Sequence, residues 1–266
     1  MLSNDSQETF ITPEWPTPNN VSAIITTRVG GVSSGEYQSF NLGDHVEDEV
    51  KAVQHNRQQL YERLGLSQQG QNIQWLQQVH GTMVAQLSKN SLSEKEADAV
   101  YSNESNHVCA VLTADCLPVL LCDKKGTEVA AVHCGWRSLL GGVLLKTLEK
   151  FNAESAELLA YLGPAISQAH FEVGEEVRES FMRAQRGGRF GGGAQGCVQR
   201  AFKVNSSAHN KYFADLYALA KAELEAAGVS QVFGGACCTY TEKERFYSYR
   251  RDGVTGRMAS LIWLNA

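Results

Sequence analysis

The pattern of apolar and polar positions predicts that the chain begins with a strand, continues through a long loop and then forms a helix. The run VSAIITT at 21–27 is rich in β-branched residues and suits a strand. The following RVGGVSSGEYQSFNLGDH is rich in Gly, Ser and Asn, a composition typical of a long loop that carries function. A helical stripe then ends at Gly65, which can close a helix. The positions on that stripe are Val50, Val53, Arg57, Leu60, Tyr61 and Leu64.

Short β-type runs fill residues 72–136 and predict the core of a sheet. They are NIQWLQQVH, TMVAQL, HVCAVLTAD, PVLLCD and EVAAVHCGW. Later, LLGGVLLKTLEKF, GEEVRESFMRA and HNKYFADLYALAKAELEAAG predict helices, while ELLAYLG, QVFGGAC and MASLIWL predict strands. The mixture favours an α/β fold, in which one domain at 21–266 has a mixed β-sheet core flanked by helices. Residues 1–20 hold three of the five prolines and predict an extended N-terminal lead-in.

Composition narrows the class of protein. The formal net charge is -5 and no dense Lys/Arg run occurs, which argues against nucleic acid or an anionic membrane as a partner. Neither a signal peptide nor an apolar run of about 20 residues is present, so we expect a cytoplasmic protein. The seven cysteines lack a regular spacing and are interpreted as reduced thiols. These features favour a monomer that acts on a small molecule.

The Gly-rich stretch RGGRFGGGAQG at 186–196 formally matches a dinucleotide-binding fingerprint through Gly191, Gly193 and Gly196. That fingerprint needs a strand before it and a helix opening after it, whereas FMRAQ precedes this stretch and CVQRAFK follows it. We therefore expect a flexible surface loop. No GxxxxGK[ST] sequence occurs, so phosphate binding of the P-loop type is not supported.

The segment AAVHCGWR at 130–137 places a histidine beside a cysteine at the end of an apolar run. Period-two alternation puts Val132 and Cys134 on one face of the strand and Ala131, His133 and Gly135 on the other. His133 and Cys134 therefore cannot both face one pocket. Cys134 is predicted to be a small core residue, as most free cysteines are.

His80, Cys116 and His133 each lie near the end of a predicted strand, in WLQQVHG, LTADC and AAVHC. If the three strand ends converge, they form one His2Cys site, the ligand number of a catalytic zinc ion. Alternatives stay open at this stage. Each histidine could be a hydrogen-bonded structural residue, or Cys116 could be a thiolate nucleophile with a histidine as its base. Copper with Met83 as axial ligand is less favoured, because no His-x-His pair occurs.

Arginines supply a second chemical signal. Arg28 lies in the first loop beside two glycines, Arg137 follows the strand of His133, and FYSYRRDGVTGR carries Arg250, Arg251 and Arg257. Guanidinium groups and glycine amides are well suited to a phosphate or another anion. Each arginine could equally be a solvated surface residue, and the aromatic residues of this segment could simply belong to the core.

Seven blocks of this sequence together closely resemble one protein family. They are TTRVGGVSSGEYQSFNLGDHV, WLQQVHG, ADAV, VLTADCLPVLL, VHCGWR, LGPAI with FEVG, and CTYTEKERFYSYRRDGVTGRMASLIWL. The family is the YfiH type of purine nucleoside phosphorylases, formerly labelled polyphenol oxidase or laccase-domain proteins. The resemblance extends from Val21 to Leu264, nearly the whole chain.

The resemblance implies a single α/β domain with the YfiH-like, cysteine-hydrolase type of fold. It also implies a zinc ion (Zn2+) bound by His80, Cys116 and His133. The implied reactions are phosphorolysis of adenosine, inosine, guanosine and methylthioadenosine, and deamination of adenosine. An alternative is an amide hydrolase that edits a UDP-muramoyl-serine peptidoglycan precursor, by zinc-bound water or by Cys116. A non-catalytic zinc or nucleotide binder is a third hypothesis.

Further roles follow for residues around the expected metal. His80, Cys116 and His133 are the expected catalytic residues, with Asp115 as a candidate proton shuttle. The substrate and phosphate are expected to contact Arg28, Asn41, Arg137, Arg250 and Arg251. The sequence departs from the family pattern at Ser138 and Glu47, each where the family usually has glycine, and in the 186–196 stretch, which resembles an insertion that could act as a lid.

Overall fold

The structure is a computed structural model that describes residues 8–66, 72–88, 91–92, 95–105, 107–191 and 196–265. Its strands form three sheets. The first has the order β1-β2-β15-β7-β3, with β1 at Phe10–Ile11, β2 at Val21–Thr26, β15 at Met258–Leu264, β7 at His107–Thr113 and β3 at Asn72–Gln74. The second has the order β14-β10-β8-β9-β6-β4-β5, with β14 at Gln231–Gly234, β10 at Leu158–Leu162, β8 at Leu117–Asp123, β9 at Val129–Cys134, β6 at Ala99–Ser102, β4 at Val84–Ser88 and β5 at Ser91–Leu92. The third has the order β11-β13-β12, with β11 at Glu172–Gly174, β13 at Lys211–Ala214 and β12 at Phe202–Val204.

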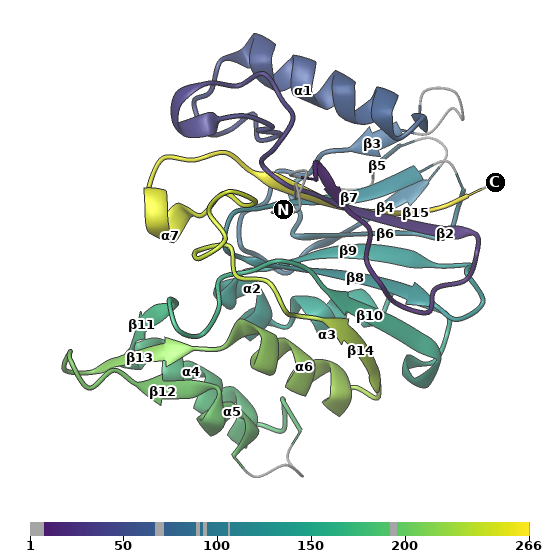
Figure 1. Cartoon of the computed structure of the whole chain (residues 1–266). Coiled ribbons are helices and arrows are strands. Elements are labelled where there is room, and N and C mark those ends of the chain that lie inside the picture. The colour runs from purple at the N-terminus through teal and green to yellow at the C-terminus, as the bar shows by residue number, and fades with distance from the viewer. Residues whose placement is uncertain are drawn as a thin grey trace, which may run out of the picture.

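Helices cover the outer faces of the two larger sheets, and the small third sheet projects from one end of the molecule (Figure 1). The α-helices are α1 at Val50–Arg63, α2 at Trp136–Gly141, α3 at Val143–Leu148, α4 at Glu175–Arg186, α5 at Cys197–Arg200, α6 at Leu216–Ala226 and α7 at Tyr249–Asp252. Short 3-10 turns occur at Gly35–Tyr37 and Ser155–Glu157. In the part of the chain described above, no helix has the length and apolar character needed to cross a membrane.

Three apolar clusters hold these layers together. One packs Leu60 of α1 against Leu112 and Leu261 of the five-stranded sheet. The second fills the space between the two larger sheets, and the third lies between the seven-stranded sheet and helices α2 to α6. Because both faces of the seven-stranded sheet are covered, all residues of its strands β8 and β9 are buried. The arrangement confirms the expected α/β class with mixed sheets, since parallel and antiparallel pairs occur in both large sheets.

Strand β9 confirms the predicted alternation. Ala131 belongs to the cluster between the sheets, while Val132 and Cys134 belong to the cluster on the helix side. His133 follows Ala131 by two positions and so lies on the intersheet face. Burial also raises the pKa of the Cys134 thiol, in agreement with its predicted role as a core residue.

Several predicted elements differ from the structure. The segment 72–80 is a strand only at Asn72–Gln74, so His80 lies in a loop. The segment 139–151 contains two short helices, because Gly142 adopts φ 90° between them. The segment 209–228 begins as strand β13 and becomes helical only at Leu216, where the Asp215 side chain caps α6. The N-terminal lead-in includes the short strand β1; residues 1–7 lie outside the described ranges.

The start of the Gly-rich stretch is anchored in the fold. Arg189 donates to the carbonyl oxygen of Leu139 at the end of α2 and forms an ion pair with buried Glu223 of α6. Phe190 is 1% exposed and packs against Phe181. The stretch is preceded by helix α4, so it lacks the strand that a dinucleotide site requires, although the short helix α5 does follow it. Residues 192–195, including Gly193, lie outside the described part of the chain.

Candidate metal centre

His80, Cys116 and His133 come together at one end of the space between the two large sheets. One ligand atom from each residue lies within 4.8 Å of the others, and the Cys116 Sγ to His80 Nε2 distance is 3.7 Å. Cys116 immediately precedes β8, and His133 of the neighbouring strand β9 pairs with Pro118 of β8. Two imidazoles and one thiol at this separation fit the donor set of a divalent metal ion such as zinc. In the described residues, this is the one such group of histidine, cysteine and acidic side chains.

Asp98, which sequence reasoning did not single out, orients both histidines. Its carboxylate lies 2.8 Å from His133 Nδ1 and accepts the backbone N–H of His80 at 2.9 Å and of Gly81 at 2.6 Å. Since Nδ1 of His133 is engaged by Asp98, Nε2 remains as its ligand atom. A buried carboxylate behind a histidine ligand fixes the ring and raises its basicity, as is common in metal sites. The only signal in the sequence was the position of Asp98 in the ADAV block.

The backbone leaves room for this cluster. A Cβ atom added to Gly135 would lie 2.7 Å from His80 Cδ2 and 3.2 Å from Cys116 Sγ. His80 itself adopts φ 59°, a left-handed conformation that is uncommon outside glycine. The backbone N–H groups of His80 and Gly81 donate to the Asp98 carboxylate, and these hydrogen bonds hold the turn in place. The absent side chain at Gly135 therefore allows His80 and Cys116 to approach each other.

Without a bound metal ion, electrostatics favour a thiolate at Cys116 and a cationic imidazole at His133. Burial would raise the pKa of Cys116, but the charge and hydrogen bonds of His133 and His80 outweigh it and lower the pKa to about 6. Burial would lower the pKa of His133, but Cys116 and Asp98 raise it to about 9. A metal ion would replace the protons as the partner of these ligands, because only the thiolate and the neutral imidazole bind metal.

Asp115 lies beside the cluster, but its carboxylate is already engaged. One oxygen accepts the Thr239 hydroxyl and the other accepts the Arg250 backbone N–H, each at 2.6 Å. Asp115 has φ 95° and follows the end of β7. The side chain therefore ties the C-terminal segment to the strand end, and both oxygens would have to give up a partner before Asp115 could move a proton.

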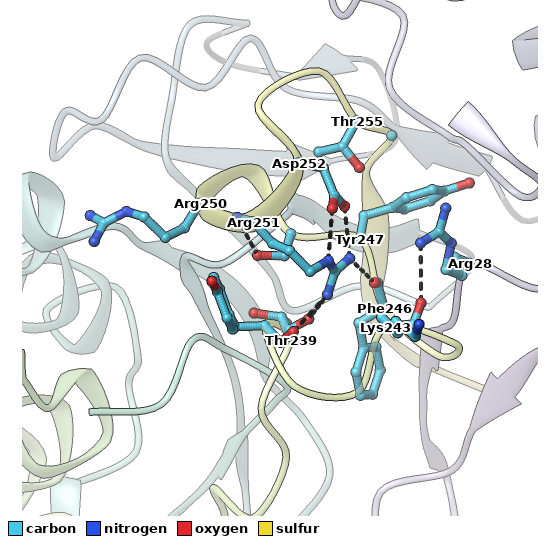
Figure 2. Close-up of polar contacts among 12 residues, drawn as sticks. Arg28, Thr239, Lys243, Phe246, Tyr247, Arg250, Arg251, Asp252 and Thr255 are labelled. Carbon is cyan, nitrogen blue, oxygen red and sulfur yellow. Dashed lines mark hydrogen bonds and ion pairs between the residues drawn. The ribbon is translucent and has the colours of Figure 1, made fainter. Parts of the chain in front are cut away.

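Arg28 and Arg251 are used to hold the C-terminal segment together (Figure 2). Arg251 donates to the carbonyl oxygens of Thr239, Tyr240 and Phe246 and pairs with Asp252. Arg28 donates to the carbonyl oxygens of Gln38 and Lys243, and its guanidinium lies 4.7 Å from the centre of the Tyr247 ring. Their hydrogen-bonding groups are therefore largely committed to the protein itself.

Arg137 and Arg250 are both exposed. Arg137 opens α2 and stacks on Trp136, with its guanidinium 4.4 Å from the ring centre. Arg250 donates to the carbonyl oxygen of Glu172 at 2.9 Å and lies over the Phe171 ring, so it braces β11 against α7. Neither of them makes a recorded contact with the three metal-ligating side chains in the described structure.

Arg257 is the arginine that lies near the cluster, and Asn41 positions it. Burial lowers the pKa of Arg257, and the largest opposing influences are the charges of Cys116 and Asp115. The Asn41 Oδ1 accepts the backbone N–H of Arg257 at 2.8 Å, and Arg257 Nη1 donates to the carbonyl oxygen of Thr255 at 2.8 Å. Its Nε and Nη2 groups have no recorded acceptor among the described residues. The conformation of the loop places Arg257 near the cluster in preference to Arg250 and Arg251. Spacing along the chain cannot predict this placement.

Met83, Ser138 and Glu47, which the sequence singles out, lie outside the metal-binding group. Met83 is 54% exposed, and the metal-binding group comprises only the two histidines and Cys116. Ser138 is buried, and its Oγ has no hydrogen-bond partner within the described structure. Glu47, where the family pattern usually has glycine, adopts φ 65°, a conformation that glycine reaches more easily.

Comparisons with known proteins identify the family of this chain. The family model described as "Multi-copper polyphenol oxidoreductase laccase" matches residues 22–265. Purine nucleoside phosphorylase YfiH of Escherichia coli is 48% identical, over 96% of this chain and 98% of that protein. A purine nucleoside phosphorylase of Pseudomonas aeruginosa is 45% identical, over 96% of this chain and 98% of its own length.

Solved structures give the same result for the fold. Neisseria meningitidis protein NMB0706 superimposes with a TM-score of 0.87 at 45% identity, covering 97% of this chain and all of that one (100%). YlmD of Geobacillus stearothermophilus gives a TM-score of 0.86 at 25% identity, covering 99% of this chain and 98% of that one. The chain therefore belongs to the multi-copper polyphenol oxidoreductase laccase family, and it is similar to proteins named purine nucleoside phosphorylase YfiH.

Proposed function

We propose that this protein is a zinc-dependent purine nucleoside phosphorylase that also deaminates adenosine. Adenosine, inosine, guanosine and methylthioadenosine are its proposed nucleoside substrates. The observation that carries the proposal is the group formed by His80, Cys116 and His133, with Asp98 hydrogen-bonded behind His133. The names of the similar proteins, at 45% to 48% identity over nearly the whole chain, supply the substrate class.

The donor set supports zinc over copper. A copper electron-transfer site combines His2Cys with a weak axial ligand such as methionine, whereas Met83 is exposed and outside the group. When bound, zinc would act as a Lewis acid and lower the pKa of a bound water molecule. His80, Cys116 and His133 would hold it, and Asp98 would keep His133 in the tautomer that presents Nε2.

Arg257 is the proposed anchor for the anionic phosphate. In phosphorolysis, a phosphate oxygen forms a bond to the anomeric carbon while the bond from that carbon to the purine nitrogen breaks. A guanidinium with free Nε and Nη2 groups can hold phosphate by two hydrogen bonds and fix its direction of approach. Asn41 supports this role because it fixes the backbone of Arg257. We also propose a cytoplasmic location, which the seven free thiols support.

The direct test is to identify the purine products of adenosine with and without phosphate, using wild type, Cys116→Ala and Arg257→Gln. Adenine that requires phosphate indicates phosphorolysis, and inosine in either buffer indicates deamination. Cys116→Ala should lose both products. Arg257→Gln should lose phosphorolysis by about 100-fold, through loss of a charged hydrogen-bond donor worth roughly 3 kcal/mol, and should retain deamination. Unchanged adenosine with the wild-type protein would contradict the proposal.

A second candidate is an amide hydrolase with Cys116 as nucleophile. It is favoured by one observation, the 3.7 Å separation between Cys116 Sγ and His80 Nε2, which suits a thiolate and its base. The same group could instead hydrolyse an amide through zinc-bound water. The two hydrolase routes differ in one measurement: activity on a muramoyl-serine amide should persist after metal chelation if Cys116 is the nucleophile, and should disappear if zinc is required.

A further inference from the structure

A groove of about 730 Å³ has Val79, the residue before the ligand His80, in its lining. Its lining consists of Asp44, His45 and Arg57, residues 73–79 and Lys95. This volume falls within the range of small-molecule sites in proteins. The groove is not lined by His80, Cys116, His133 or Arg257, so the proposed phosphorylase chemistry does not use it.

Arg57 is a cation with an incomplete set of partners in the wall of this groove. Its side chain is 18% exposed, Nε donates to the Leu42 carbonyl oxygen at 2.9 Å, and Nη1 lies 3.1 Å from Asp44. Nη2 is buried and has no hydrogen-bond partner within the described structure. The balancing carboxylate of Asp44 is 64% exposed, so solvent screens it. Because Nη2 is shielded from the groove as well, an anion in the groove would approach the part of the Arg57 side chain that stays exposed, whose charge is balanced only by the solvent-screened Asp44.

The other residues on the walls agree with this charge. Asp44 is the one acidic residue among the described residues that line the groove, whereas Arg57 and Lys95 are cations. Lys95 is exposed and has no recorded ion pair in the described chain. The Trp75 ring lies under the Arg57 guanidinium, 4.4 Å from its centre, and keeps the guanidinium in place. Gln74 and Gln77 add amide groups that can donate and accept hydrogen bonds.

We propose that this groove is a second ligand site, which binds a small organic anion through its phosphate or carboxylate oxygens. Arg57 and Lys95 hold the anion, and Gln74, Trp75 and Gln77 contact the remainder of the molecule. The site is distinct from the phosphate position at Arg257. Binding there does not depend on whether nucleosides are turned over, so the two proposals fail separately.

The four tryptophans allow a direct measurement of where an anion binds. The protein is labelled with 15N in its tryptophan indoles, and the Trp75 resonance is assigned from a Trp75→Phe variant. Pyrophosphate and citrate serve as the phosphate and carboxylate probes. Saturable movement of the Trp75 resonance by either probe is the expected result, and the more effective probe identifies the oxyanion. If only Trp136, beside the metal centre, moves, or if no resonance moves, the proposal is wrong.

Charge-removing variants complete the test. Arg57→Gln and Lys95→Gln should each weaken probe binding at Trp75 at least about tenfold, the loss expected for one charged hydrogen bond. Lys95 is exposed, so its variant tests the proposal even if Arg57→Gln perturbs the loop at residues 42–44, which Arg57 contacts. Arg178→Gln is the matched control, because Arg178 also stacks on an aromatic ring, that of Tyr212 at 5.0 Å, away from the groove. Equal affinity in Lys95→Gln and wild type would overturn the proposal.

Discussion

Asp98 connects the two histidines of the metal centre, although it contacts no substrate. It receives the backbone N–H of His80 and Gly81 and engages Nδ1 of His133. Replacement by asparagine would place an N–H2 group or a weaker acceptor against these donors. We expect Asp98→Asn to lower metal affinity about 10- to 100-fold, the usual effect of losing a carboxylate behind a histidine ligand. Competition with a chromophoric chelator measures this affinity.

Asp123→Asn is the control for that experiment. Asp123 is also buried and lies at the end of β8 that is far from the metal centre. It accepts the backbone N–H groups of Thr127 and Glu128 in the turn that leads to β9. Its replacement should destabilise the fold while leaving the metal affinity of the folded protein unchanged. Equal losses of metal affinity in the two variants would show that Asp98 acts only through general stability.

Gly135 makes a second prediction at the residue scale. An added methyl group at this position would lie 2.7 Å from His80 Cδ2, so His80 must move. Gly135→Ala should therefore reduce metal content and activity together, with little loss of secondary structure. At Gly81, by contrast, a methyl group would meet its nearest atom at 3.4 Å, an ordinary contact. Metal analysis of both purified variants checks this difference; full metal content in Gly135→Ala would contradict it.

At the scale of elements, alternation in a strand could be predicted from sequence, but the conformation of loops could not. His133 and Cys134 were assigned to opposite faces because side chains in a strand alternate with period two. Cys116 is predicted from its position near the end of a predicted strand, as His80 and His133 are. The role of Asp98 beside the histidines could not be predicted, because Asp98 reaches the site through its contacts with a turn at residues 79–81. No sequence periodicity encodes such a contact.

The remaining differences have local causes. The run HNKYFADLYALAKAELEAAG resembles one helix, but Asp215 caps α6 and leaves the preceding residues free to pair as β13. For the C-terminal arginines, spacing along the loop does not predict where each side chain points. The contact from Asn41, 216 residues earlier in the chain, determines that Arg257 is the arginine near Cys116.

Glu128 illustrates how one side chain holds an element in place. It precedes β9, is 4% exposed, and accepts the Tyr101 hydroxyl at 2.5 Å, the Asn152 backbone N–H at 2.8 Å and the Ala153 N–H at 3.0 Å. Burial alone would raise its pKa, but these hydrogen bonds lower it below the usual 4.5. The carboxylate therefore stabilises the native state fully above pH 4.5, and this stabilisation is lost as pH falls through the lower native pKa.

We expect Glu128→Gln to reduce the free energy of unfolding by about 2 kcal/mol at pH 7. The difference from wild type should shrink as pH falls below 4.5, because the wild-type carboxyl becomes protonated and loses the same interactions. Urea unfolding at pH 7 and near pH 3.5 measures both values. A difference that stays constant between these pH values would show that the charge of Glu128 contributes nothing.

At the scale of the whole molecule, the layered fold determines where the metal centre lies. The two sheets bury their facing sides, and the site occupies the end of that apolar layer, where β7, β8 and β9 give way to loops. His80 lies in the loop between β3 and β4, Cys116 in the connection between β7 and β8, and His133 in β9, so the fold brings the three side chains together before any metal binds. A bound ion would therefore add to the stability of a fold that the apolar clusters already define.

This arrangement predicts a modest but measurable effect of metal removal. A ligand present at a thousand times its dissociation constant stabilises the native state by about 4 kcal/mol, and for a chain of this size that corresponds to a Tm shift of roughly 10 °C. A strong chelator should lower the Tm of the wild-type protein by an amount of this order without unfolding it at 25 °C.

Two cysteine variants test where the stabilising metal lies. In Cys116→Ala the chelator should change the Tm little, because one of three ligands is already lost. Cys134→Ala should be less stable overall through its cavity in the core, yet keep the full chelator effect, since Cys134 faces away from the centre. A chelator effect of equal size in Cys116→Ala and Cys134→Ala would place the stabilising metal elsewhere in the molecule.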